Sequence, residues 1–269
     1  MEPPRGPMPS PPHARALLLS AIAGAAVAAV WALGPIPQDP AYHVFADDRA
    51  FWGIPNFWNT ISSLPLALLG LAGLVGTGTA GGIAGTPQRL FFLGLLGAGL
   101  GSAWYHLAPD NGRLLWDRLG MTLAFAGFVS IVAFRVMGPA PGRRLALPLA
   151  VFGCASVLYW YAGERVGAGD LRPYVIVQFL PLLIVPAMLL LYAGAEGGGR
   201  PWIAAALLCY VIAKALEAGD ALVMGLGGWI SGHTLKHLSA ASGALCVLVM
   251  LRRHPAPADS GDQQDPRPP

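Results

Sequence analysis

Three histidines lie in segments of this sequence that are otherwise apolar. His233 and His237 are four residues apart, so on a helix their side chains share one face. Two imidazoles at this spacing can hold one metal ion, and a third imidazole completes the ligand set of a catalytic zinc site, whose fourth position stays open. His106 is the third histidine in such a segment. We therefore predict that His106, His233 and His237 bind Zn²⁺.

Two polar residues near His106 could serve a reaction at that metal. Ser102 lies one helical turn before His106, and Asp117 follows a Pro-Asp-Asn-Gly turn. Zinc lowers the pKa of bound water toward 7 and polarises a carbonyl group. The Asp117 carboxylate could take the water's proton and pass it to a leaving amine, while Ser102 could donate a hydrogen bond to the oxyanion. Together these groups predict hydrolysis of an amide or ester.

Each of these residues also has a plainer interpretation. A single histidine near the end of a membrane helix is commonly an interfacial polar residue. The Ser102 hydroxyl could simply satisfy a backbone carbonyl. Asp117 could be a carboxylate at a helix start, opposite Arg113 or Arg118. The prediction of a metal site depends on the five side chains meeting at one place.

The composition indicates what kind of protein must position them. Of 269 residues, 55% are hydrophobic and 12% are charged, and this charged share is about half the ~25% of soluble domains. These values exclude a disordered chain, a coiled coil and an ordinary water-soluble enzyme. A net charge of +3 is too small for a nucleic-acid surface. The predicted fold class is all-α: a polytopic transmembrane helical bundle, with glycines that suit close helix packing in lipid.

Apolar runs of about 20 residues, the length that crosses a bilayer, occur eight times. Their predicted bounds are Ala14–Gly34, Asn56–Thr79, Gln88–Leu107, Arg113–Val136, Arg144–Ala162, Pro173–Ala193, Pro201–Ala218 and Trp229–Leu251. The first run is predicted to be an extra N-terminal helix over 14–34, with a secretory signal sequence as the alternative. Residues 45–251 form the main membrane domain, and the Pro-rich tails 1–13 and 254–269 are predicted to be disordered.

Charge asymmetry predicts the orientation of these spans. With the N-terminus inside, ten arginines fall on the cytoplasmic side and five outside, which favours cytoplasmic N- and C-termini. The third span then ends outside near His106, the fourth begins near Asp117, and the last reaches His233 about 6 Å below its outer end. All five site residues should thus lie in the outer leaflet. The Ala-, Gly- and Pro-rich composition indicates a bacterial source, and hence the inner (plasma) membrane.

The other ionisable residues within spans have structural interpretations. Lys214 and Glu217 are three residues apart on the seventh span, so we expect an internal ion pair. Lys236 is expected to extend outward along the last helix toward the membrane surface. The three cysteines, all in apolar stretches, are interpreted as packing residues.

Three blocks of the sequence resemble the alkaline ceramidase family, in the superfamily of seven-helix membrane hydrolases that includes the progestin and adiponectin receptors. Asn56-Phe-Trp-Asn-Thr-Ile-Ser-Ser is similar to the family's Glu-Phe-Trp-Asn-Thr-x-Ser-Asn. Gly101-Ser-Ala-Trp-Tyr-His and Asp117-Arg-Leu-Gly-Met are similar to Gly-Ser-x-x-Phe-His and Asp-Glu-Leu-Pro-Met. Gly232-His-Thr-Leu-Lys-His is similar to Gly-His-x-x-x-His. The likeness covers residues 45–250 and leaves the first span outside the seven-helix core.

This resemblance implies an activity and a cofactor. The family cleaves ceramides, which are membrane lipids, into a sphingoid base and a fatty acid. The resemblance implies that the three histidines are zinc ligands and that Ser102 and Asp117 serve the reaction. The animal enzymes also bind Ca²⁺ through an acidic segment before the first core helix. Here only Asp47 and Asp48 are acidic in that stretch, and Arg118 stands where the family has Glu.

Three other functions remain open at this point. A lipid sensor or receptor could use the same fold and site with little turnover. A haem protein could use His106 and one of the other two histidines as axial ligands. A metal transporter would need ligands along a path near the bilayer midplane. The sequence does not determine the oligomeric state.

Overall fold

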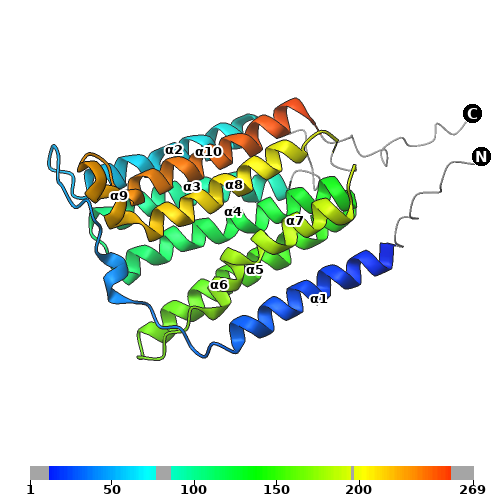
Figure 1. Cartoon of the computed structure of the whole chain (residues 1–269), viewed down its shortest axis with the longest axis horizontal. Helices are drawn as coiled ribbons and strands as arrows, with labels where there is room; N and C mark the ends of the chain where they lie inside the picture. Colours follow the sequence, from blue (N-terminus) through cyan, green and yellow to red (C-terminus); the bar gives the residue numbers. More distant parts are fainter. Residues whose placement is uncertain (1–11, 77–85, 195–196, 256–269) are drawn as a thin grey trace, which may run out of the picture.

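The computed structural model describes residues 12–76, 86–194 and 197–255, and these residues form an all-α bundle without strands. The long helices run side by side along the long axis of the molecule (Figure 1). The predicted disordered tails, apart from residues 12, 13, 254 and 255, lie outside the described residues, as does the end of the second predicted span at 77–79.

Eight helical segments are long and apolar enough to cross a membrane, which confirms the predicted polytopic bundle. The helices are α1 (Pro12–Trp31), α2 (Phe57–Gly76), α3 (Thr86–Leu107), α4 (Asn111–Met137), α5 (Pro139–Glu164), α6 (Arg172–Phe179), α7 (Pro181–Leu191), α8 (Arg200–Ala218), α9 (Asp220–Gly227) and α10 (Gly232–Arg253). A 3₁₀ turn, Pro40–His43, lies between α1 and α2. Helices α6 and α7 together make one span.

Three details of the helices differ from the sequence prediction. The predicted sixth span is broken at Leu180, because Pro181 at the start of α7 has no N–H to continue the helical hydrogen bonds. The predicted loop after the seventh span contains the short helix α9. The last helix begins at Gly232 and not at Trp229, because the Ser231 side chain caps it by accepting a hydrogen bond from the Thr234 N–H.

Close contact between α3 and α4 fixes the end of the bundle where the site lies. A Cβ placed on Gly120 would come within 2.1 Å of the Ala98 backbone nitrogen, and one on Gly101 within 2.7 Å of the Asp117 nitrogen. Such contacts need glycine at both positions, since any side chain would push the helices apart. The short Pro-Asp-Asn-Gly turn, where Asp110 caps α4, then returns the chain beside His106.

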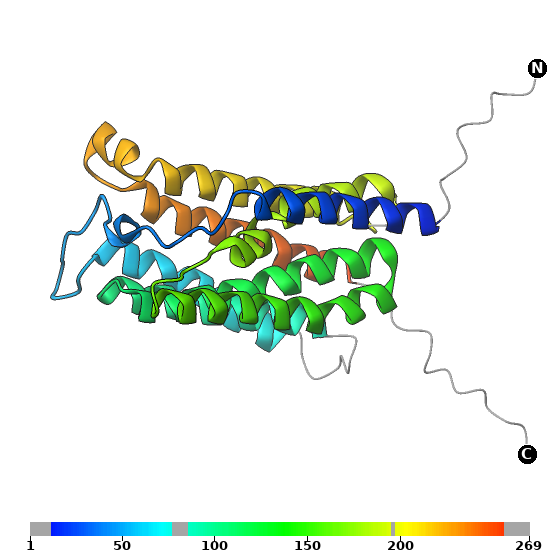
Figure 2. The same ribbon diagram turned by 90° about the horizontal axis from the view of Figure 1, so that it is seen from below.

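Helix α1 lies at one edge of the bundle, against α6 and α7, and is separate from the helices that carry the predicted site (Figures 1 and 2). Apart from Leu19, the described residues of α1 are exposed or half-buried. The structure therefore consists of a closely packed bundle, α2 to α10, with one extra helix on its side.

Candidate metal centre

The three predicted histidines meet at one point. His106 lies in the last turn of α3, and His233 and His237 lie in the first two turns of α10. Their ring centroids are 4.9–5.1 Å apart, and one ring nitrogen from each lies within 4.8 Å of the others. All three side chains are buried. This group could hold a metal ion, as the spacing of the histidines predicted.

His106 gives the clearest indication that something binds here. It is fully buried, and among the described residues neither of its ring nitrogens has a hydrogen-bond partner. An unpaired buried polar atom costs about 1–3 kcal/mol. A metal ion would take up one of these nitrogens, and imidazole is among the ligands that zinc prefers. The residues present thus fit a metal ion held by three histidines.

Hydrogen bonds from α2 and α3 orient the His237 ring. Its Nδ1 lies 2.9 Å from the Ser62 hydroxyl and 3.4 Å from that of Ser63. Its Nε2 lies 3.4 Å from the Ser102 hydroxyl. Both serines of α2 also donate to the Asn59 carbonyl oxygen. Metal-bound histidines commonly have their second nitrogen paired in this way, which fixes the ring and its tautomer.

A half-buried ion cluster adjoins His233. The Lys236 ammonium donates to Glu217 Oε1 at 2.8 Å and lies 3.2 Å from His233 Nε2. Glu217 also pairs with Lys214, which confirms the predicted ion pair on α8. The prediction that Lys236 extends to the membrane surface is wrong, because Glu217 on the neighbouring helix holds it inside the bundle. An ammonium only donates, so His233 Nε2 is the acceptor, and metal binding at that nitrogen would require Lys236 to move.

Ser102 and Asp117 line a cavity together with one residue of the ion cluster and one of the three histidines. The cavity has a volume of about 160 Å³, and its polar lining is Ser102, Asp117, Lys236 and His237. Asp117 is 7% exposed. The alternative partners of this carboxylate are engaged elsewhere, since Arg113 pairs with Asp110 and Arg118 donates to Gln38. The structure thus brings all five predicted residues to one end of the bundle.

This whole cavity is called here the site cavity. Away from its polar end, its lining is mostly apolar. On each of three helices its lining runs for eleven residues away from the polar end: from Ser102 to Phe91 on α3, from Asp117 to Phe128 on α4, and from Lys236 to Val247 on α10. At 1.5 Å per residue, the site cavity is about 16 Å long. An elongated apolar cavity of this kind suits a hydrocarbon chain.

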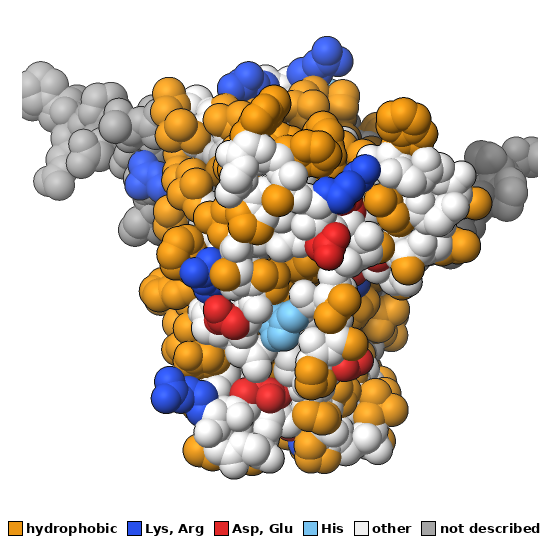
Figure 3. Space-filling model, turned by 90° about the vertical axis from the view of Figure 1, so that its left-hand side faces the viewer, with side chains coloured by type: hydrophobic (Ala, Val, Ile, Leu, Met, Phe, Trp, Pro, Cys, Tyr) orange, Lys and Arg blue, Asp and Glu red, His pale blue; other side chains and the backbone are white. Residues whose placement is uncertain are grey.

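The loop between the 3₁₀ turn and α2 covers the cluster at the end of the bundle. The Phe45 ring lies 4.7 Å from the rings of both His106 and His233, edge to face. Asp220 joins this loop to α10, because its carboxylate accepts the N–H groups of Ala46 and His233. Figure 3 shows this end, where charged side chains of both signs are interspersed and hydrophobic side chains cover the flanks.

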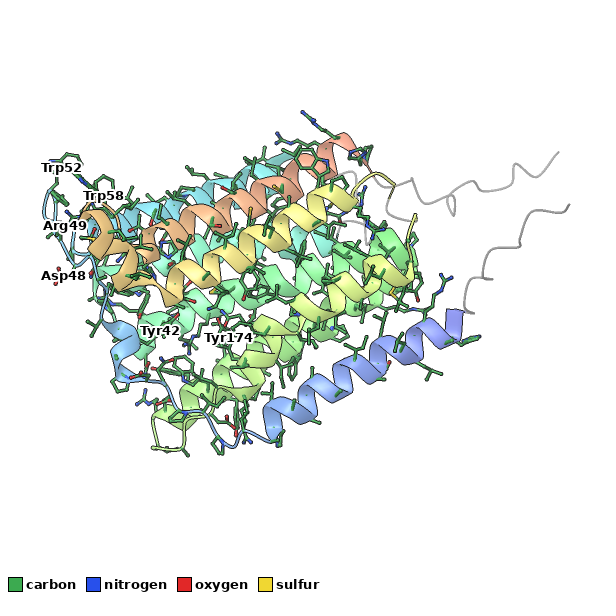
Figure 4. The ribbon with its side chains drawn as sticks, viewed as in Figure 1. Tyr42, Asp48, Arg49, Trp52, Trp58 and Tyr174 are labelled. Carbon is green, nitrogen blue, oxygen red and sulfur yellow. The ribbon has the colours of Figure 1, made fainter. Side chains whose placement is uncertain are left out.

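An ion pair fixes the same loop. Asp47 and Arg49 pair at 2.7 Å, and Arg49 also donates to the carbonyl oxygens of Gly228 and Trp229. The hydrogen bond from Arg49 holds the pKa of the Asp47 carboxyl below its usual range. Asp48, Arg49, Trp52 and Trp58 all lie at this end of the molecule (Figure 4).

Arg118, where the resembled family has Glu, belongs to an aromatic cage rather than to the cavity. Its guanidinium lies 5.5, 4.2 and 4.8 Å from the ring centroids of Tyr42, Trp160 and Tyr174, and the first and last of these are labelled in Figure 4. Burial raises the pKa of the Tyr42 hydroxyl. The cage ties the loop before α2 to α4, α5 and α6.

Sequence reasoning missed Phe45, Ser62 and the link from Lys236 to Glu217. The signal for Ser62 was present, since Asn59, Thr60, Ser62 and Ser63 make a polar run inside an apolar span. Nothing in the sequence marks Phe45, because its role depends on the path of a loop.

Fold and site together define a polytopic α-helical membrane protein with a buried three-histidine cluster that could hold a metal ion. No protein-family model matches the chain, and no curated protein matches it.

Proposed function

We propose that this protein is a zinc-dependent amidohydrolase of ceramide-like membrane lipids, releasing a sphingoid base and a free fatty acid, as its likeness to alkaline ceramidases implies. The observation that carries the proposal is a buried three-histidine cluster of which one member, His237, lines the polar end of an apolar cavity together with Ser102 and Asp117. Three nitrogens around one point favour a single ion over a haem with two axial ligands. Their place at one end of the bundle argues against a transport path through its middle.

The histidines would hold the ion while the cavity binds the lipid. Zinc, when bound, supplies a Lewis acid that acidifies water and polarises a carbonyl. His237 is held in place by Ser62, so its Nε2 faces the cavity side, where Ser102 lies. Phe45 over His106 and His233 keeps bulk water from the ligands on the loop side.

Asp117 and Ser102 would handle the proton and the developing charge. The Asp117 carboxylate oxygen accepts a proton from the attacking water and then donates it to the nitrogen of the leaving sphingoid base. The Ser102 hydroxyl donates a hydrogen bond to the carbonyl oxygen as negative charge develops there. The acyl chain leaves with the carboxylate, along the apolar wall of the cavity. The reaction consumes one water molecule and yields one acid and one amine.

The proposal includes a place in the membrane. With cytoplasmic termini in a bacterial inner membrane, the histidine end of the bundle would lie near the outer leaflet, at the depth of a lipid's amide. A ceramide-like lipid would then enter sideways between helices. The two acidic residues of the loop, Asp47 and Asp48, leave a role for Ca²⁺ without support, since Asp47 is already paired with Arg49.

The test is hydrolysis of ceramide, dihydroceramide and phytoceramide by detergent-purified protein, followed as release of free fatty acid. We expect release that a zinc chelator abolishes and that added zinc restores. No release from protein with one bound zinc would contradict the hydrolase assignment, and saturable ceramide binding by the same sample would then favour the lipid sensor.

Replacing the proposed base separates catalysis from binding. Asp117→Asn should lower the turnover number by about 10²- to 10⁴-fold, the usual contribution of a positioned general acid–base. The zinc content and the melting temperature should stay close to those of the wild type. Asp48→Asn, at an exposed position of the loop, is the matched control. Full turnover by zinc-loaded Asp117→Asn would refute this role.

A further inference from the structure

Helix α1 is fixed to the bundle at both ends. Near its C-terminus, Arg172 Nη1 donates to the Trp31 carbonyl oxygen at 3.1 Å, and the guanidinium lies 4.5 Å from the Trp31 ring. Near its N-terminus, the Arg15 guanidinium lies 5.2 Å from the Tyr192 ring. These contacts hold α1 in place although few of its side chains are buried.

Between α1 and the bundle lies a second cavity of about 350 Å³, called here the α1 cavity. Its α1 wall consists of Leu19 and the smaller residues Ala16, Ser20 and Ala23, and its other walls come from α4, α5, α6 and α7. Small residues four and seven positions apart normally let membrane helices pack closely. Here they line open space, so the small side chains widen a cavity instead of closing a contact.

The α1 cavity and the site cavity adjoin each other. Phe125 and Pro181 line both of them. The Phe125 ring packs edge to face on Tyr210 at 5.2 Å, and the Tyr210 hydroxyl donates to the Gln178 carbonyl beside the break between α6 and α7. Phe125 and Pro181 therefore belong to a shared wall, called here the partition, beside the break between α6 and α7.

The partition lies within reach of a lipid at the metal centre. Phe125 is eight residues beyond Asp117 on α4, or about 12 Å along the helix. Wall atoms that face an empty space lose the dispersion contacts that neighbouring atoms would provide. Inside a bilayer, the apolar molecules at hand to fill it are lipid chains. A lipid whose polar linkage lies at Asp117 can thus place one chain toward Val247 and the other past Phe125.

We propose that the α1 cavity binds one of the two hydrocarbon chains of the lipid whose amide lies at the histidine cluster. The proposal rests on the proposed function, which it narrows to lipids with two chains. Helix α1 is then part of the substrate site rather than a membrane anchor only.

Photolabelling tests this directly, without depending on turnover. Two ceramide probes carry a diazirine, one at the end of the N-acyl chain and one at the end of the sphingoid chain. A phosphatidylcholine with a diazirine at the end of its acyl chain reports bulk bilayer lipid. We expect one ceramide probe to label the 16–23 segment of α1 more strongly than phosphatidylcholine does, and unlabelled ceramide to compete with it. Labelling no stronger than that of phosphatidylcholine, or no labelling by either probe, would overturn the proposal.

Variants matched in size connect the labelling to the cavity. Ala16→Leu/Ala23→Leu fills the cavity, whereas Ala21→Leu/Ala28→Leu adds the same atoms at exposed positions of α1. The first pair should reduce labelling of α1 on the order of tenfold, since close packing leaves no room for a chain beside the new side chains, and the second should not. Should the filled variant fail to fold, Phe125→Trp, which thickens the partition, should lower labelling of α1 and spare that of α10. Unchanged labelling in a folded variant of either kind would contradict the proposal.

Hydrolysis assays on the same samples keep the two proposals apart. Specific labelling of α1 without fatty-acid release by zinc-loaded protein would contradict the hydrolase proposal and support the chain-binding site in the α1 cavity. Fatty-acid release without specific labelling of α1 would support the hydrolase proposal and contradict the chain-binding site.

Discussion

At the scale of single residues, the hydroxyl of Ser62 determines how the His237 imidazole is presented. It lies 2.9 Å from Nδ1 and donates its own proton to the Asn59 carbonyl oxygen. A hydroxyl that donates elsewhere must accept from Nδ1–H, which leaves on Nε2 a lone pair that faces Ser102 and could bind a metal ion. The chain of hydrogen bonds therefore selects one tautomer of His237.

Removing that hydroxyl should weaken metal binding without removing a ligand. We expect Ser62→Ala to lower zinc affinity by about 10- to 100-fold, as the loss of a hydrogen bond behind a metal-bound histidine usually does. Competition with a chromophoric chelator measures it. Ser63→Ala is the matched control, because its longer contact with Nδ1, 3.4 Å, predicts a smaller loss. Equal affinity of Ser62→Ala and the wild type would show that the hydroxyl does not orient the ring.

The sequence was sufficient to predict the three histidines and their meeting point, but not the groups around them. Helical periodicity places His233 and His237 together, and the order of spans brings His106 to the same end. Lys236 shows the limit of such reasoning. Its partner, Glu217, lies on another helix 19 residues away in sequence, and the rotation of α8 against α10 decides whether the two can pair.

At the scale of elements, contact between the α3 and α4 backbones positions Asp117. Gly120→Ala would place a methyl group 2.1 Å from the Ala98 nitrogen, so the helices must separate. We expect a loss of stability of about 1–3 kcal/mol, seen as a lower melting temperature in detergent. Gly24→Ala in α1, where a Cβ would meet no atom within 4 Å, should not lower it. A wild-type melting temperature for Gly120→Ala would mean that this contact does not hold the helices in register.

The loop that carries Phe45 should respond to acid through Asp47. A carboxylate whose pKa is lowered in the folded protein stabilises it above the unfolded value, about 3.9 for Asp, and that stabilisation disappears as the pH falls through the folded value. Asp47→Asn should therefore melt about 2–4 °C below the wild type near neutral pH. This difference in melting temperature should disappear at a pH below the usual pKa range of Asp. Asp48→Asn provides the comparison. A difference in melting temperature that stays constant in acid would exclude the Asp47–Arg49 ion pair as its cause.

Apolar length predicts which segments cross the membrane, because a bilayer requires a fixed length of helix. It does not predict breaks and short helices. The interruption at Pro181 falls inside a run that is apolar throughout, and α9 is too short to give a periodic pattern. The α1 cavity could not be predicted from the sequence either, because an unfilled space depends on how five helices pack together.

At the scale of the whole molecule, the eight candidate spans among the described residues are an even number, which favours both ends of the bundle on one side of the membrane. From the excess of arginines we predict that this side is the cytoplasm. In a variant without the native cysteines, Asp48→Cys should react with a membrane-impermeant maleimide added to intact cells. His254→Cys, at the opposite end, should react only after the membrane is opened. The reverse pattern would invert the orientation and move the histidine cluster to the inner leaflet.

The ion cluster beside the histidines has a consequence for how the chain is made. A lysine within a span raises the cost of leaving the translocation channel for lipid by about 2.5–3.5 kcal/mol. Helix α8 carries its own counter-charge, since Lys214 and Glu217 are one turn apart, but α10 contains no acidic residue to offset Lys236. In the part of the chain that the structure describes, its ion-pair partner is Glu217 on α8. The two helices should therefore enter the bilayer as a hairpin, so that the last quarter of the chain is released into lipid in one step. His233 and His237 would then arrive after the rest of the bundle is in place.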